Sequence, residues 1–130
     1  MEDCKMDGVV HFEIPVDNVK RATEFYKKLF GWDIQKAGNM PYWMARTCEC
    51  DEQFMPKEKG KINGGFYERN KESSPNPSMV VKIKNIDESV KKIKAAGGKV
   101  LFDVRNVGDM GRYTQFKDTE GNIVGLWQDL

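Results

Sequence analysis

The chain has 130 residues, which is enough for one domain with a hydrophobic core. Its 21 Lys and Arg residues balance 20 Asp and Glu residues, so the net charge of +1 provides no attraction to nucleic acid. No apolar stretch approaches the roughly 18 residues of a membrane span, and the N-terminus lacks the apolar core of a secretory signal; we therefore expect a cytoplasmic protein.

The first predicted strand covers residues 8–15, where apolar and polar side chains alternate. Phe12 and Ile14 fall on one face of this strand, whereas His11 and Glu13 share the other. Because successive residues of a strand rise about 3.3 Å each, the backbones of His11 and Glu13 lie roughly 6–7 Å apart and their side chains can converge on one ligand.

A helix follows this strand directly. Asp17 and Asn18 are both good N-cap residues, residues 19–30 place apolar side chains at helical spacing, and Gly31 is suited to end the helix. Three further strands are predicted over residues 32–36, 42–49 and 62–69. The glycine pair 64–65 in the last strand indicates that another part of the chain approaches the backbone closely.

The same order of elements begins again after residues 69–77, a polar stretch with two prolines that we interpret as a linker. The predicted elements of this second half are a strand over 78–84, a helix between Asn85 and Gly97-Gly98, a strand over 99–104, and a hairpin of 110–118 and 122–128.

A shift of 67 residues places Asn18 on Asn85 and Gly31 on Gly98, so the chain contains an internal repeat. The predicted fold class is α+β, with two βαβββ modules in tandem that form a curled mixed sheet. We expect a single domain over residues 1–130, and its parts are module one at about 8–68, the linker at about 69–77 and module two at about 78–128.

The cysteines do not indicate a disulfide framework. There are three of them, Cys4, Cys48 and Cys50, and an odd count leaves one without a partner. A structural zinc site needs four ligands, and His11 is the single histidine of the chain. We therefore expect reduced thiols.

Three stretches in the expected order carry a resemblance to a known family: HFEIPVDNVKRATEFYKKLFGW, IDESVKKIKAAGGKV and FKDTEGNIVGLWQ. Together they resemble the vicinal oxygen chelate superfamily, which includes glyoxalase I, extradiol dioxygenases and the bleomycin- and fosfomycin-resistance proteins. Within it, the chain is most similar to the small glyoxalase-like group related to lactoylglutathione lyase. The resemblance implies the glyoxalase/bleomycin-resistance fold.

The resemblance also implies where a metal would be held, since metal-dependent members use one ligand from the first and one from the last strand of each module. Carried over to this chain, those four positions are His11, Gly65, Ser78 and Gly125. Glycine offers no side chain, and only His11 matches the family's ligand types. We therefore expect no metal and no other cofactor.

The remaining candidate site residues follow from strand alternation and from the resemblance. His11 and Glu13 are the candidate catalytic pair, because neutral imidazole transfers protons near pH 7; the alternative is a polar strand face without chemistry. The candidate ligand-binding residues are Tyr67, Ser78, Trp127 and Trp43. Tyr67 and Trp127 either wall a ligand site or fill the core.

We predict a metal-independent small-molecule binding protein that holds its ligand in the cup of the sheet. The alternative is a lactoylglutathione lyase-like lyase or isomerase that uses His11 and Glu13, with a divalent metal such as Zn, Ni or Mn. The expected partners are a small-molecule ligand and a second copy of the chain in a homodimer, with no nucleic acid and no membrane.

Overall fold

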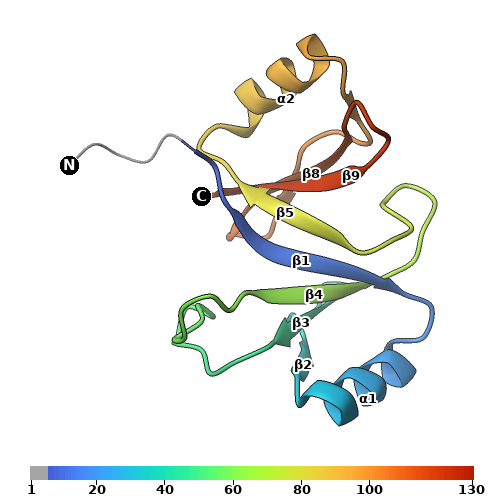
Figure 1. The fold of residues 1–130 in the computed structure, drawn as a ribbon, viewed down its shortest axis with the longest axis vertical. Helices are drawn as coiled ribbons and strands as arrows, with labels where there is room; N and C mark the ends of the chain where they lie inside the picture. Colours follow the sequence, from blue (N-terminus) through green and yellow to red (C-terminus); the bar gives the residue numbers. More distant parts are fainter. Residues whose placement is uncertain (1–5) are drawn as a thin grey trace. The chain divides into compact units, whose positions relative to one another are not determined.

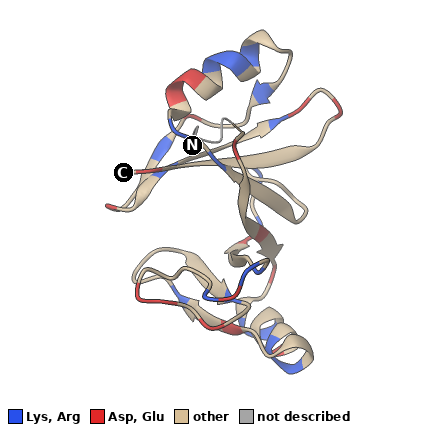
Figure 2. Cartoon of the chain, turned by 60° about the vertical axis from the view of Figure 1, so that its left-hand side comes forward, with Lys and Arg blue, Asp and Glu red and all other residues tan. Residues whose placement is uncertain are grey.

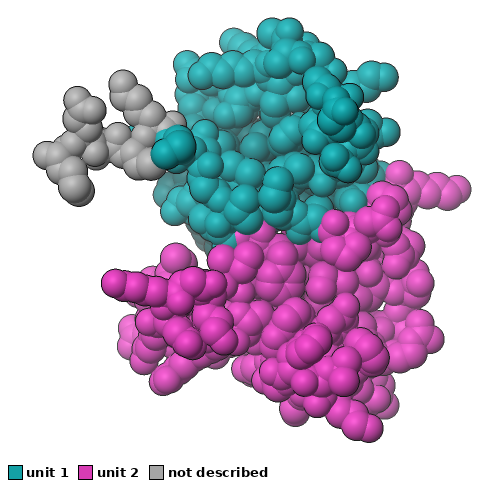
Figure 3. All heavy atoms as spheres, in the orientation of Figure 1, with its two compact units in different colours: residues 1–10, 72–74, 78–130 teal, residues 11–71, 75–77 magenta. Residues whose placement is uncertain are grey.

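The computed structural model describes residues 6–130, which form two compact units (Figure 3). Unit 2 contains residues 11–71 and 75–77. Unit 1 contains, of the described residues, 6–10, 72–74 and 78–130. Cys4 lies outside the described residues, whereas Cys48 and Cys50 are free thiols.

Unit 2 folds in the predicted order of strand, helix and three strands (Figure 1). Its elements are β1 (Val9–Val16, of which the first two residues are counted with unit 1), α1 (Val19–Phe30), β2 (Asp33–Lys36), β3 (Tyr42–Arg46) and β4 (Asn63–Glu68). The strand order is β2-β3-β4-β1, with β1 and β4 parallel and the other pairs antiparallel.

Unit 1 repeats this mixed sheet. Its elements are β5 (Ser78–Lys82), α2 (Ile86–Ala95), β6 (Lys99–Val100), β7 (Arg105–Val107), β8 (Gly111–Lys117) and β9 (Ile123–Asp129). The strand order is β5-β9-β8-β6, β7 also pairs with β8, and β5 and β9 are parallel. The predicted α+β class with two βαβββ modules is thus confirmed.

Local sequence signals fix the ends of both helices. The Asn18 side chain accepts a hydrogen bond from the Arg21 backbone N–H at 2.9 Å, and Gly31 ends α1 in the left-handed conformation with φ 72°. Asn85 caps α2 in the same way through the Glu88 backbone N–H at 3.1 Å.

The charges of α2 are arranged along its dipole. Acidic residues occupy the first turn and basic residues the last, as the red and blue segments of Figure 2 show. Asp87 in the first turn also accepts a hydrogen bond from Arg112 of β8 at 2.8 Å, so Arg112 is engaged on the helix side of its sheet.

Each helix covers one face of the sheet in its own unit, and the apolar core of that unit lies between the helix and the sheet. In unit 2 the buried members are Val16, Ala45 and Phe66, with Trp32 stacked on Tyr26 at a ring distance of 5.1 Å beside them. In unit 1 the corresponding buried members are Ile83, Ile86 and Leu126. Each sheet therefore has a second face that does not meet the helix.

One predicted strand is broken in the structure. The alternation over residues 99–104 predicted a continuous strand, but β6 ends at Val100 and β7 starts at Arg105. Val100 pairs with Phe116 and Arg105 pairs with Tyr113. The two paired positions are therefore five residues apart on this segment but only three residues apart on β8. The extra residues cannot continue the ladder, and they bulge out.

Within residues 6–130, neither helix is long and apolar enough to cross a membrane.

Candidate functional site

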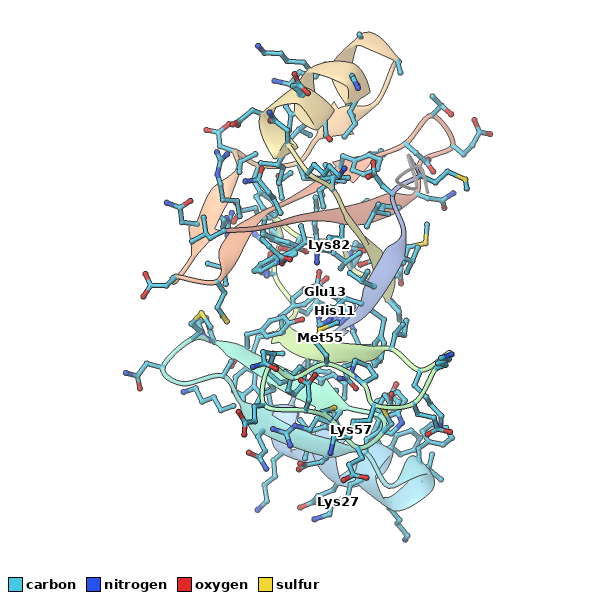
Figure 4. The ribbon with its side chains drawn as sticks, turned by 90° about the vertical axis from the view of Figure 1, so that its left-hand side faces the viewer. His11, Glu13, Lys27, Met55, Lys57 and Lys82 are labelled. Atoms are coloured by element: carbon cyan, nitrogen blue, oxygen red, sulfur yellow. The ribbon has the colours of Figure 1, made fainter. Side chains whose placement is uncertain are left out.

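The candidate site in unit 2 is the sheet face opposite α1. Side chains directly across from each other in paired strands share a face, and His11 pairs with Asn63 while Glu13 pairs with Gly65. The third strand adds two side chains, since Met44 pairs with Gly65 and Tyr42 with Tyr67. We call this set the His11 face, and its members are His11, Glu13, Tyr42, Met44, Asn63, Gly65 and Tyr67. Figure 4 labels His11 and Glu13, the two candidate catalytic residues.

Tyr42 lies across Gly65. A Cβ atom built on Gly65 would overlap the phenol ring of Tyr42, so only glycine leaves room for that ring. The Tyr42 hydroxyl lies 2.6 Å from Nε2 of His11, and the two rings are stacked with an angle of 22° between their planes. Gly65 is therefore what allows Tyr42 to reach His11.

His11 is half-buried, and its surroundings keep it neutral. Burial lowers the pKa of the imidazole from 6.5 to about 4, because the charged form loses more hydration than the neutral form. Glu13, two residues further along β1, is only 5% exposed. The predicted pair is thus a neutral imidazole and a buried carboxyl group on one face.

Asn63 fixes the segment that joins β3 to β4. Its side-chain oxygen accepts from the Thr47 backbone N–H at 3.0 Å, and its amide nitrogen donates to the Phe54 carbonyl and to Cys50 Sγ, each at 3.1 Å. The Asn63 side chain is nearly inaccessible, and its backbone pairs with His11. This end of the His11 face is therefore held by a buried polar network.

Unit 1 contains the corresponding positions. Val80 pairs with Gly125 as Glu13 pairs with Gly65, so Ser78 takes the place that His11 has in unit 2. Ser78 Oγ is buried and has no hydrogen-bond partner within residues 6–130.

In unit 1, Tyr113 faces Gly125 as Tyr42 faces Gly65, but the Tyr113 ring lies further from the glycine. A Cβ on Gly125 would meet Val80 Cγ2 at 3.0 Å and Tyr113 Cε1 at 3.2 Å. The Tyr113 hydroxyl accepts a hydrogen bond from Gln115 Nε2 at 2.7 Å, and Gln115 Oε1 accepts from the Ser74 backbone N–H. Gln115 is 1% exposed, so Tyr113 is held by a buried network rather than by a histidine.

The three aromatic residues predicted to bind a ligand, Tyr67, Trp127 and Trp43, do not all lie on the sheet face opposite the helix. Tyr67 lies on the His11 face and is 9% exposed. Trp127 lies on the face of Gly125, its ring covers Gly111, and its indole N–H donates to Asp129 at 2.7 Å. Trp43 points to the other face of its sheet and packs against the core under α1, so it is not part of the His11 face.

Two shallow grooves open on unit 2, and neither contains a predicted site residue. One has a volume of about 360 Å³ and is lined by Gly31, Asp33, Arg46, Thr47, Cys48, Glu49 and Cys50. The other has a volume of about 290 Å³ and runs along the start of α1, beside Arg21 and Phe25.

Sequence reasoning missed the two tyrosines, Tyr42 and Tyr113. The available signal was the glycine pair 64–65, which indicated close approach to the backbone without showing which side chain approaches.

The side chains present do not fit the metal that the resemblance implies. Of the four expected ligand positions, two are glycines, and the space over Gly65 is filled by the Tyr42 ring. Within residues 6–130, no three His, Cys, Asp or Glu side chains are grouped so that they could hold a metal ion.

These features define an α+β protein of two βαβββ modules, each with a polar sheet face opposite its helix. The chain belongs to the Glyoxalase/Bleomycin resistance protein/Dioxygenase superfamily, whose family model matches residues 8–126.

Two relatives agree with this assignment. A Mycobacterium bovis protein named "Putative glyoxylase CFP32" is 30% identical over 112 residues, which are 82% of this chain and 40% of the relative. The chain thus spans less than half the length of that protein. A "Glyoxylase-like domain-containing protein" of Didymella fabae is 28% identical over 114 residues, or 85% of this chain and 84% of the relative.

Solved structures share the fold. A hypothetical protein from Bacillus halodurans superposes with a TM-score of 0.64 at 13% identity, covering 97% of this chain and 96% of that chain. Methylmalonyl-CoA epimerase from Mycobacterium tuberculosis gives a TM-score of 0.60 at 15% identity, covering 95% of this chain and 88% of that chain. At these identities the likeness shows the fold alone.

Proposed function

We propose that this protein binds a small organic molecule without a metal ion, and that the His11 face of unit 2 contacts the ligand. The observation that carries the proposal is the position of Tyr42, whose ring fills the space over Gly65 and whose hydroxyl occupies Nε2 of His11. The phenol takes up the space over Gly65 and one of the two imidazole nitrogens through which His11 could bind an ion. The face retains hydrogen-bonding groups and aromatic surface, which are what small-molecule sites use.

Ser78 and Trp127 stay predicted ligand residues in unit 1. The buried Ser78 hydroxyl has no partner within residues 6–130, and a ligand oxygen or a water molecule would satisfy it. Trp127 already donates to Asp129, so it would offer the ligand ring surface rather than a hydrogen bond. The homodimer and the cytoplasmic location likewise stay predictions from the resemblance and the sequence.

Metal loading tests the proposal directly. The tag-free protein is loaded separately with Zn, Ni, Co, Mn and Fe, and bound ions are counted by elemental analysis beside the His11→Ala and His11→Gln variants. We expect no stoichiometric ion in any of them, while a thermal-shift screen of aromatic and carbonyl compounds finds binders. About one ion per chain in the wild type, lost in both variants, would contradict metal independence.

A second candidate is a lyase or isomerase that uses His11 and Glu13. It is favoured by the neutral imidazole and the buried carboxyl group on one face, because such a pair can accept and return a proton. In that case hemithioacetals are isomerised by the wild type, and the rate falls at least about 100-fold in both His11→Gln and Glu13→Gln. The absence of turnover in the wild type removes this candidate and leaves the binding function.

A further inference from the structure

Two thiols lie in the larger of the two grooves on unit 2. Cys48 and Cys50 are separated by one residue, both are half-buried, and both line the groove of about 360 Å³ together with Arg46 and Thr47. Both cysteines are free thiols. The residues that line this groove are all outside the His11 face, so the pair belongs to a different place on unit 2 from the site proposed above.

The backbone of Cys50 is held in a short hairpin. Cys50 forms an antiparallel bridge with Pro56, and the Lys57 backbone N–H donates to the Glu49 carbonyl at 3.0 Å. The chain bends at residues 47–48, directly before this hairpin. Residues two apart in an extended chain have Cα atoms roughly 6–7 Å apart, and a bend shortens this distance. It therefore falls in the range of about 4.4–6.8 Å that a disulfide spans.

The side chain of Cys50 is engaged on both sides. Its thiol donates to the Cys48 carbonyl at 3.2 Å, and its sulfur accepts from the Asn63 side-chain amide at 3.1 Å. Main-chain groups fix the orientation of this amide, because the Thr47 N–H can only donate to its oxygen and the Phe54 carbonyl can only accept from its nitrogen. The Cys50 sulfur is thus folded back toward the residue that carries the other thiol.

The Cys48 side chain has no such partners. Within residues 6–130, no hydrogen bond or ring contact engages its sulfur. Thiols react as thiolates, and a sulfur that must first give up two hydrogen bonds reacts more slowly than one that is unengaged. Of the two thiols that line the groove, Cys48 is therefore the one that attacks first, and Cys50 is the one that reacts second.

We propose that Cys48 and Cys50 form a dithiol site that exchanges reversibly with low-molecular-weight disulfides. The Cys48 thiolate attacks one sulfur of the small disulfide, whose S–S bond breaks and releases the first small thiol. The Cys50 thiolate then attacks the Cys48 sulfur of this mixed disulfide, and the second small thiol is released. The protein loses two electrons and two thiol protons, the small disulfide gains them, and a bond between Cys48 and Cys50 forms.

Peptide mapping tests this site. The full-length protein is treated under native conditions with bis(2-hydroxyethyl) disulfide, quenched with acid and digested with trypsin. Trypsin cuts after Arg46 and Lys57, so both thiols lie on the peptide 47–57, whereas Cys4 lies on another peptide. We expect the peptide 47–57 to lose two hydrogen atoms, and dithiothreitol to restore them. A peptide that stays reduced, or that carries a 2-mercaptoethanol adduct on each cysteine, overturns the proposal.

The order of attack is tested with two variants. Cys50→Ser is expected to stop at one 2-mercaptoethanol adduct, on Cys48, because the serine hydroxyl can make both hydrogen bonds of Cys50 but cannot release the adduct. Cys48→Ser is expected to form its adduct about tenfold more slowly, because Cys50 must give up its two hydrogen bonds. Wild-type protein quenched early is expected to carry its first adduct on Cys48, which tests the order without any substitution.

Unfolding provides the control for the role of the fold. In urea the hydrogen bonds of Cys50 are lost, so the two variants are expected to form adducts at closely similar rates. Circular dichroism without urea checks that each variant is folded. Equal rates in the folded variants, a tenfold difference that persists in urea, or a first wild-type adduct on Cys50 overturns the inference. Because the readout is the mass of one peptide, none of these results depends on ligand or metal binding at the His11 face.

Discussion

Replacing Gly65 with alanine is expected to lower the free energy of unfolding by about 3 kcal/mol, although only one methyl group is added. Gly65 does not have a positive φ, so the backbone accepts alanine, and the effect comes from packing alone. The new Cβ would overlap the Tyr42 ring, which must move and give up its hydrogen bond to His11. Urea unfolding of the two proteins measures the difference.

A double-mutant cycle separates this mechanism from a general intolerance of the strand. In a Tyr42→Ala background the obstructing ring is absent, so Gly65→Ala is expected to cost less than about 1 kcal/mol, a coupling of about 2 kcal/mol. Gly125→Ala is the matched control, because its Cβ would meet neighbours at 3.0 Å and beyond and needs only small adjustments. Equal costs at Gly65 and Gly125, or additive costs of Gly65→Ala and Tyr42→Ala, would show that the ring does not occupy this space.

Local signals in the sequence were sufficient for the fold. The caps Asn18 and Asn85 and the left-handed Gly31 act within a few residues of themselves, so they could be located without tertiary information. The alternation in β1 placed His11 and Glu13 on one face for the same reason, since a strand repeats every two residues.

The site depended on pairing between distant strands. Tyr42 and Trp43 are adjacent aromatic residues on β3, and both are half-buried, so alternation could not show which residue faces the ligand side. The pairing of Tyr42 with Tyr67 decides it, and this pairing joins residues 25 positions apart. Trp43, the predicted ligand-binding residue, is partly buried and packs against the core beneath α1.

The break between β6 and β7 was hidden for a similar reason. Residues 99–104 have the composition of a strand, and the bulge arises only because the facing stretch of β8 is shorter. The Thr114 hydroxyl donates to the Phe102 carbonyl at 2.6 Å, which satisfies a backbone group that the ladder no longer pairs. A side chain twelve residues away thus stabilises a local irregularity.

The free energy of unfolding is expected to fall by about 3 kcal/mol as the pH is lowered from 6.5 to about 4, because of His11. The imidazole of the unfolded chain takes up a proton as the pH falls through about 6.5, whereas the folded protein resists this until about pH 4. Protons therefore favour the unfolded chain throughout this window. The stability is fully present above pH 6.5 and is lost progressively below it.

His11→Gln is the control, because its side-chain amide can both donate and accept a hydrogen bond with Tyr42 but does not titrate. The most informative range is from about pH 6.5 to pH 5, since carboxyl groups ordinarily titrate near pH 4. Asp87, Asp118 and Asp129 have lowered carboxyl pKa values, and they lose their contribution at still lower pH as they become protonated in the folded protein.

Equilibrium unfolding in urea at several pH values measures the free energy of unfolding of the wild type and of His11→Gln. The wild type is expected to lose about 1.4 kcal/mol per pH unit once the pH is well below 6.5, and His11→Gln is expected to be nearly flat from about pH 6.5 to pH 5. Identical slopes for the two proteins would mean that His11 is accessible and protonated in the folded state.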